Sequence, residues 1–189
     1  IAAARTEAIA AAYGVNKGLI HYNFQRNAGL YRAVLQNVFG GVLEQSLTVL
    51  ESEASPGERL LRWNLQHFDR MVAHREYQNL MQQEMIRVRQ GESASLPLLV
   101  RTYFRPVTQK ILKVIKEGVR SGELCDMEPL QIAYSLFGVN ASYFMSAPIM
   151  RLAASFEPFS PASLARRRKA SLTFLALALF VDRAHGNTV

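Results

Sequence analysis

The sequence predicts an all-α fold, with short helices near the N-terminus followed by a bundle of longer helices. Apolar residues recur at the 3.6-residue spacing of an amphipathic helix, and no stretch sustains the period-2 alternation of a half-buried strand. The hairpin dipeptides Asn-Gly and Asp-Gly do not occur. Clusters of Ser, Pro and Gly separate the periodic segments, as they do at helix ends. The chain therefore predicts helices packed on helices, without a sheet.

The ends of the expected helices follow local sequence patterns. The segment SPGE at 55–58 is typical of a helix start, because the serine caps the helix and the glutamate completes a capping box. Ser160 and Pro161 open the last helix in the same way, and Pro106 should kink or interrupt the helix that contains it. The expected helices span about 6–12, 16–22, 28–52, 56–73, 76–90, 96–120, 129–146 and 162–184.

The composition favours a globular protein of the reducing cytosol with an anionic partner. Lys and Arg outnumber Asp and Glu by 22 to 15, which gives a net charge of +7 and suits DNA or an anionic membrane surface. The longest apolar run, 170–181, contains Ser171 and Thr173 and is too short to cross a bilayer. The single cysteine, Cys125, excludes an internal disulfide. We therefore expect a cytoplasmic protein that does not enter the membrane.

Residues 5–24, RTEAIAAAYGVNKGLIHYNF, have the pattern of a helix-turn-helix. This motif requires a small residue where two short helices touch, a residue that tolerates positive φ at the turn, a few apolar residues inside, and a cap for the second helix. Ala10 is the small residue at the helix contact, and Gly14 is the residue at the turn. Ile9, Val15 and Ile20 are the apolar residues inside, and Asn16 caps the second helix. The pattern predicts a helix-turn-helix module whose second short helix spans 16–22.

The same stretch resembles the TetR/AcrR family of transcriptional regulators. The resemblance lies in AIAAAYGVNKGLIHYNF followed by GLYRAVL, and it extends from residue 5 to about residue 40. It implies a helix-turn-helix DNA-binding domain at 1–40 and a helical effector-binding and dimerisation domain at 41–189. It also implies a repressor that binds palindromic operator DNA as a homodimer and is released by a small-molecule effector.

The resemblance assigns the DNA contacts to the two short helices. Lys17 suits a phosphate or a guanine edge, and His21 and Tyr22 suit phosphate oxygens. Arg5 and Thr6 stand where the positive end of the first helix dipole favours phosphate. The full set of expected DNA-binding residues is Arg5, Thr6, Lys17, Gly18, Leu19, His21 and Tyr22.

Three features depart from the family pattern. Asn23 occupies the place of an aromatic residue, and Asn27 the place of a lysine. Only Ile1–Ala4 precede Arg5, whereas the family has a complete first helix there. We expect that this sequence omits residues, either before Ile1 or between Ala4 and Arg5.

Two polar residues interrupt the apolar stripes of the middle helices. Asn64 and Glu84 fall among apolar and aromatic side chains, and a buried carboxylate must be paired or protonated. An internal ion pair with Arg or His and a pocket for an effector remain alternative interpretations. The expected pocket residues are Trp63, Asn64, His67, Met71, Met81, Glu84, Met85, Tyr103 and Phe104.

The last two helices are apolar on more than one face, which predicts that a second chain covers part of them. The resemblance implies the same, because the family dimerises through its two final helices. The expected interface residues are Tyr134, Phe137, Ala141, Phe144, Leu172, Leu175 and Leu179.

Motifs of catalysis are absent from the sequence. The four histidines are scattered, and HExxH, GxSxG, GxGxxG and a P-loop do not occur. We therefore expect neither an enzyme nor a metal site nor a cofactor. The alternative to a DNA-binding regulator is a helical ligand-binding or interaction module without DNA binding, and DNA affinity with a steep salt dependence distinguishes the two.

Overall fold

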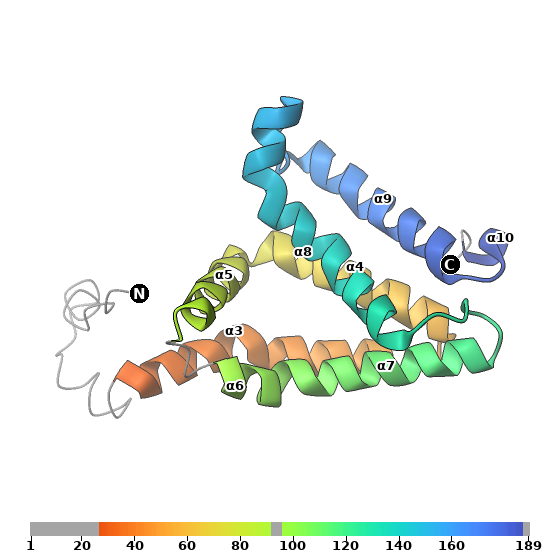
Figure 1. Cartoon of the computed structure of the whole chain (residues 1–189), viewed down its shortest axis with the longest axis horizontal. Helices are drawn as coiled ribbons and strands as arrows, with labels where there is room; N and C mark the ends of the chain where they lie inside the picture. Colours follow the sequence, from red (N-terminus) through yellow and green to blue (C-terminus); the bar gives the residue numbers. More distant parts are fainter. Residues whose placement is uncertain (1–26, 92–95, 187–189) are drawn as a thin grey trace.

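The computed structural model describes residues 27–91 and 96–186, and in these ranges it is helical (Figure 1). The predicted all-α fold is confirmed, and the only β-type pairing in the described part is an isolated bridge between Leu124 and Phe180. The expected helices at 6–12 and 16–22 lie outside the described residues. In chain order the elements are α3 (Asn27–Leu50), α4 (Pro56–Ala73), α5 (Arg75–Arg89), α6 (Leu96–Leu99), the π-helical turn η1 (Val100–Phe104), α7 (Arg105–Arg120), α8 (Pro129–Ala154), α9 (Pro161–Leu179) and α10 (Arg183–Gly186).

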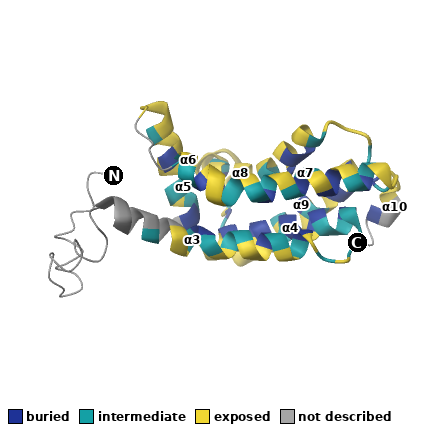
Figure 2. Ribbon diagram, turned by 90° about the horizontal axis from the view of Figure 1, so that it is seen from below, coloured by how far each residue is buried: buried dark blue, intermediate teal, exposed yellow. Residues whose placement is uncertain are grey.

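The helices bury one face each and share a continuous apolar interior. α3 and α7 run side by side, and α4 packs against α3, α7, α8 and α9 (Figure 1). Along each long helix, buried positions alternate with exposed ones in Figure 2, as the sequence spacing predicts. The main core is built on Leu60, Leu61, Trp63, Ile111, Ile115, Leu136, Leu175 and Phe180; a second cluster joins Phe39, Phe68, Met71, Tyr77, Leu99 and Phe144.

The start of α4 follows the predicted pattern with one difference. Ser55 Oγ accepts a hydrogen bond from Glu58 N at 3.3 Å, so the serine caps the helix. The Glu58 carboxylate pairs with Arg62 on the next turn. Glu123, from the segment after α7, accepts hydrogen bonds from Ser55 Oγ at 2.5 Å and from Gly57 N at 3.1 Å. The free backbone N–H groups at the start of α4 therefore donate to Glu123, which is distant in the sequence, as well as to the local Ser55.

Pro106 interrupts the expected helix 96–120, as predicted. The proline ring has no N–H and crowds the carbonyl of the residue four positions earlier, so it disfavours a regular α-helix in the preceding turn. The chain instead forms the wide π turn Val100–Phe104 and resumes as α7 at Arg105.

Two predicted helix ends were wrong. α8 continues past Pro148 to Ala154 and ends at Ser155, whose φ of 49° is left-handed. The last helix stops at Leu179 rather than 184, because Phe180 is extended and the backbone there pairs with the segment after α7. Cys125 N donates to Leu179 O at 2.8 Å, and Val181 N donates to Glu123 O at 3.0 Å.

Ion pairs and hydrogen bonds from α9 hold it to the body of the molecule. Arg168 makes a bidentate contact with Asp69 of α4, at 2.8 Å and 2.9 Å. Arg167 donates to the Val139 carbonyl of α8 and lies 5.3 Å over the Tyr143 ring. Within the described residues, no helix is long and apolar enough to cross a membrane.

Candidate ligand-binding site

A cavity of about 450 Å³ lies among α4, α5, η1 and α8. This volume falls in the range of sites for small molecules. Its lining residues come from four separate elements, so the cavity exists only once the bundle has formed. They are His67 and Met71 of α4; Tyr77, Gln78, Met81, Gln82, Met85, Ile86 and Arg89 of α5; Phe104 of η1; and Phe137, Ala141, Phe144 and Met145 of α8.

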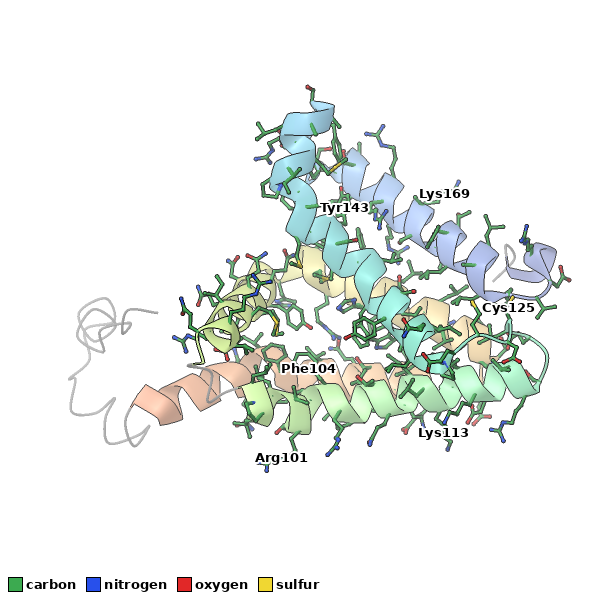
Figure 3. The ribbon with its side chains drawn as sticks, in the orientation of Figure 1. Arg101, Phe104, Lys113, Cys125, Tyr143 and Lys169 are labelled. Atoms are coloured by element: carbon green, nitrogen blue, oxygen red, sulfur yellow. The ribbon has the colours of Figure 1, made fainter. Side chains whose placement is uncertain are left out.

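The walls of the cavity are mostly apolar and rich in methionine. Methionine side chains are flexible and polarizable, so they adapt to ligands of different shape. Phe104 closes one end from η1: in Figure 3 its side chain lies on the inner side of the bundle, whereas Arg101 points away from it. Met85, Ile86 and Met145 are exposed and form the open rim. The cavity therefore offers an apolar interior with an entrance between α5 and α8.

Two side chains of this wall that carry polar atoms are buried, Tyr77 of α5 and His67 of α4, and the contacts of His67 are the more informative. The His67 ring stacks on Trp63 with centroids 5.3 Å apart. Burial, followed by repulsion from Arg70, lowers the pKa of His67 to about 4. The imidazole is therefore neutral at physiological pH, and the cavity wall carries no positive charge at this point.

Two buried asparagines join α4 to α8 behind His67. Asn64 Nδ2 donates to Leu136 O at 2.8 Å, and Asn140 Nδ2 donates to Asn64 O at 2.9 Å. The same Asn140 nitrogen lies 3.3 Å from His67 Nδ1. These hydrogen bonds fix the position of the imidazole relative to both helices.

Five of the nine predicted pocket residues line the cavity: His67, Met71, Met81, Met85 and Phe104. The other four lie elsewhere. Trp63 is in the core behind His67, and Asn64 is in the interface between α4 and α8. Tyr103 packs 5.7 Å from the ring of Phe39.

Glu84 also lies outside the cavity lining. It is fully buried, and its carboxylate is 3.6 Å from Arg87 Nη1, one turn along α5. Of the two interpretations that the sequence left open, this position favours the internal ion pair over the pocket.

The expected interface residues are divided among three environments. Phe137, Ala141 and Phe144 line the cavity, and Leu175 and Leu179 are buried in the core of their own chain. Leu172 is half-buried against that core, whereas Tyr134 is 71% exposed. The large apolar side chains that α8, α9 and the segment after α9 expose are Leu130, Tyr134, Met145, Ile149, Met150, Leu152, Phe174, Leu177 and Val181.

Sequence reasoning missed the contribution of α8 to the cavity. Phe137, Ala141 and Phe144 follow helical spacing on one face, so the burial of that face was predictable, but the cavity that these residues and Met145 border was not. The expected DNA-binding residues lie outside the described residues: Arg5, Thr6, Lys17, Gly18, Leu19, His21 and Tyr22. In the described ranges, no group of three or more His, Cys, Asp or Glu side chains could hold a metal ion.

Comparison with known proteins identifies this arrangement of helices. The fold is shared with a transcriptional regulator of the TetR/AcrR family from Thermobifida fusca YX-ER1 (TM-score 0.69, 20% identity, covering 90% of this chain and 84% of that one). It is also shared with a putative fatty acid metabolism regulator from Clostridium perfringens (TM-score 0.69, 18% identity, covering 90% and 86%). Among curated proteins, no sequence matches the chain.

A family model gives the stronger result. The family described as "Tetracyclin repressor-like, C-terminal domain" matches residues 56–174, which is more than half of the chain and includes α4 to α8 and most of α9. The chain therefore belongs to the TetR family of transcriptional regulators.

Proposed function

We propose that this chain is a repressor that binds palindromic operator DNA as a homodimer and is released when a small apolar molecule occupies the cavity. In this proposal residues 1–40 read the DNA and residues 41–189 bind the effector and dimerise. The observation that carries the proposal is a set of ring contacts between α3 and the cavity. Phe39 of α3 packs 5.0 Å from the ring of Tyr77 and 5.6 Å from the ring of Phe104, and both of these rings line the cavity.

These contacts supply a route from effector to DNA. α3 begins at Asn27, inside the proposed DNA-binding domain, and continues to Leu50 in the effector domain. A ligand that displaces Tyr77 or Phe104 must also displace Phe39, because well-packed aromatic rings leave little free volume. An effector then acts by binding more tightly to the form in which the two recognition helices are misaligned.

The exposed faces of α8 and α9 support the homodimer. A shallow groove between them is bordered by the small residues Ser135, Gly138 and Ser142 of α8, and by Phe174 of α9. Small residues allow a second helix to approach closely, and exposed aromatic and aliphatic side chains supply the apolar area that an isologous interface buries.

Binding to DNA is the first test. The full chain is titrated with duplex DNA from the region upstream of its own coding sequence, over a series of salt concentrations. We expect the logarithm of the affinity to fall steeply with the logarithm of the salt concentration, and Lys17→Ala to weaken binding and flatten that slope by about one unit. Lys113→Ala is the control, because Lys113 is exposed on α7 and points away from the bundle (Figure 3). A helical ligand-binding module without DNA function would show no such affinity.

The coupling is tested separately with Phe39→Leu. The smaller, non-aromatic side chain keeps the site apolar but removes the ring contacts with Tyr77 and Phe104. We expect DNA binding to persist while release by a cavity ligand needs more ligand. Release at an unchanged ligand concentration would show that the signal does not travel through Phe39.

A further inference from the structure

The hydrogen bonds around His67 determine where its single imidazole proton lies. Asn140 Nδ2 donates to the Asn64 carbonyl, which identifies that atom as the amide nitrogen and not the oxygen. The nitrogen carries two hydrogens, and its second neighbour is His67 Nδ1 at 3.3 Å. Since an amide nitrogen does not accept hydrogen bonds, His67 Nδ1 must be the acceptor. A neutral imidazole with an accepting Nδ1 carries its proton on Nε2.

The Nε2–H group has no acceptor among the described residues. Trp63 covers one face of the ring, Phe137 meets it edge-on at 5.9 Å, and Asn140 occupies the Nδ1 edge. His67 lines the cavity, and since these neighbours occupy a face and the Nδ1 edge of its ring, we infer that the Nε2 edge borders the cavity. A donor in a mostly apolar wall gains a hydrogen bond when a ligand supplies an acceptor, so the site favours such a ligand.

The glutamines and the arginine of the lining are either hydrogen-bonded within the protein or exposed at its surface. Gln78 Nε2 donates to the Met71 carbonyl at 2.5 Å, so its amide is held against α4. Gln82 and Arg89 are exposed on α5 and belong to the outer part of the cavity. Tyr77, which also lines the cavity and carries a hydroxyl, is as buried as His67 but belongs to the α5 wall. His67 is therefore the donor that α4 presents to a bound molecule, among methionines and aromatic rings.

We propose that the effector is an apolar carbonyl compound, such as a ketone, ester, lactone or amide, whose oxygen accepts a hydrogen bond from His67 Nε2–H. This assignment rests on the proposed function, since it names the chemical class of the molecule that would release the protein from DNA. The apolar body of the ligand lies against Met71, Met81, Phe104 and Phe144, with its outer end toward Met85 and Met145.

The electrostatics of the site favour a neutral acceptor over a carboxylate. The imidazole is uncharged at physiological pH, so it provides no counter-ion for an anion at the inner end. The guanidinium of the neighbouring Arg70 is engaged by Gln45 at 2.6 Å. Moving an unpaired carboxylate into apolar surroundings costs far more than moving a carbonyl group there.

The first test is the tautomer of His67 in the full-length, ¹⁵N-labelled protein. Nitrogen chemical shifts should show a protonated Nε2 and an unprotonated Nδ1. A proton on Nδ1 would overturn the proposal, because His67 would then offer no N–H donor at Nε2. This measurement needs no substitution, so it does not depend on the folding of a variant.

The second test compares two probes of nearly equal shape, 4-phenylcyclohexanone and phenylcyclohexane. Binding is followed by the fluorescence of Trp63, the only tryptophan in the chain, whose ring stacks on His67. We expect the ketone to bind about fivefold more tightly than the hydrocarbon, which is the value of one neutral hydrogen bond in a buried site. His67→Phe should abolish this difference, whereas the control Phe104→Leu should weaken both probes by the same factor and keep it.

Each remaining outcome contradicts the proposal. Equal affinities in the wild type would show that the donor is not used, and no binding of either probe would exclude this class of ligand. Affinity for upstream DNA is measured on the same preparation without any probe. If DNA binding is intact and the ketone preference is missing, the ligand class is wrong and the regulator assignment stands; if DNA binding itself is absent, the proposed function fails.

Discussion

The imidazole of His67 lies flat against the indole of Trp63, with ring centroids 5.3 Å apart and an angle of 4° between the planes. Both residues belong to α4 and are four positions apart, so one helix face presents them together. Trp63 is 2% exposed and belongs to the core, whereas His67 borders the cavity. This pair therefore connects the packing of the bundle to the wall of the ligand site.

The neutral state of His67 predicts a loss of stability in mild acid. In the unfolded chain this histidine gains a proton near pH 6.5, but in the folded protein only near pH 4. Between these values the unfolded state binds more protons, so the free energy of unfolding should fall as the pH drops, by about 3 kcal/mol in total. Urea denaturation at intervals from pH 8 to pH 4 measures this decrease.

The control for this prediction is His67→Phe, which keeps a ring against Trp63 but cannot titrate. Glu117 also contributes to acid sensitivity, because the hydrogen bond from Arg59 lowers its pKa and is lost on protonation. That contribution is common to both chains, so the difference between their curves isolates His67. Parallel curves for wild type and variant would show that His67 is not buried in its neutral form.

Gly57 lies where α4 meets the end of α9, and it should not tolerate a side chain. A Cβ atom at this position would be 2.6 Å from Phe180 Cε1 and 2.7 Å from Glu123 Oε1. We expect Gly57→Ala to lower the free energy of unfolding by about 1–3 kcal/mol, as overpacking in a core does. Gly40→Ala is the control, because nothing lies within 4 Å of a Cβ there and alanine favours the α3 helix. Thermal or urea unfolding of both variants measures the difference, and equal stabilities would contradict the close approach of Phe180 to Gly57.

Local sequence patterns predict most helix boundaries, and long-range contacts explain the failures. The bounds of α4 agree with the prediction, because Ser55 and Pro56 act within one turn of the helix start. The end of α9 could not be predicted in this way. Its apolar pattern continues through Val181, but the backbone at 179–181 pairs with residues 123–125, which are more than 50 positions away in the sequence. The expected end of α8 before Pro148 was also wrong, because the exposed last turns of this helix tolerate the proline.

The candidate site was only partly predictable, for a related reason. A helical apolar stripe shows that a face is buried, but not whether it meets core, cavity or a second chain. Phe137 and Phe144 are therefore expected from the sequence in a dimer interface, yet they lie on the cavity wall. The role of His67 depends on Asn140, which is 73 residues away, so no local pattern could indicate it.

The outward face of α9 supports a prediction about assembly. Phe174 is 60% exposed and borders the groove between α8 and α9. If this face forms the interface, the wild type should have twice the monomer mass of 21.2 kDa at micromolar concentration, and Phe174→Asp should shift it to the monomer. Light scattering after gel filtration measures both masses. Val100→Asp, on the exposed side of η1, should leave the dimer intact. A Phe174→Asp chain that remains dimeric would place the interface elsewhere.

Glu84 should act on stability and not on ligand binding. Its carboxylate is fully buried, lies 3.6 Å from Arg87 Nη1 and does not border the cavity. Glu84→Gln keeps the shape of the side chain but removes the charge that compensates the arginine. We expect the free energy of unfolding to fall by about 2 kcal/mol, the usual cost of weakening a charge-assisted contact in a protein interior. Urea unfolding measures the stability, and Trp63 fluorescence measures the affinity for 4-phenylcyclohexanone, which should be unchanged.

The control is Glu53→Gln, an exposed carboxylate in the segment between α3 and α4, which should alter stability by less than about 0.5 kcal/mol. The opposite pattern for Glu84→Gln, with unchanged stability and weakened binding, would mean that the carboxylate contacts the ligand. The cavity would then have an anionic side that the present lining lacks, and a cationic effector would replace the carbonyl compound as the expected ligand. Because the two readouts move independently, one variant distinguishes a structural ion pair from a group that recognises the ligand.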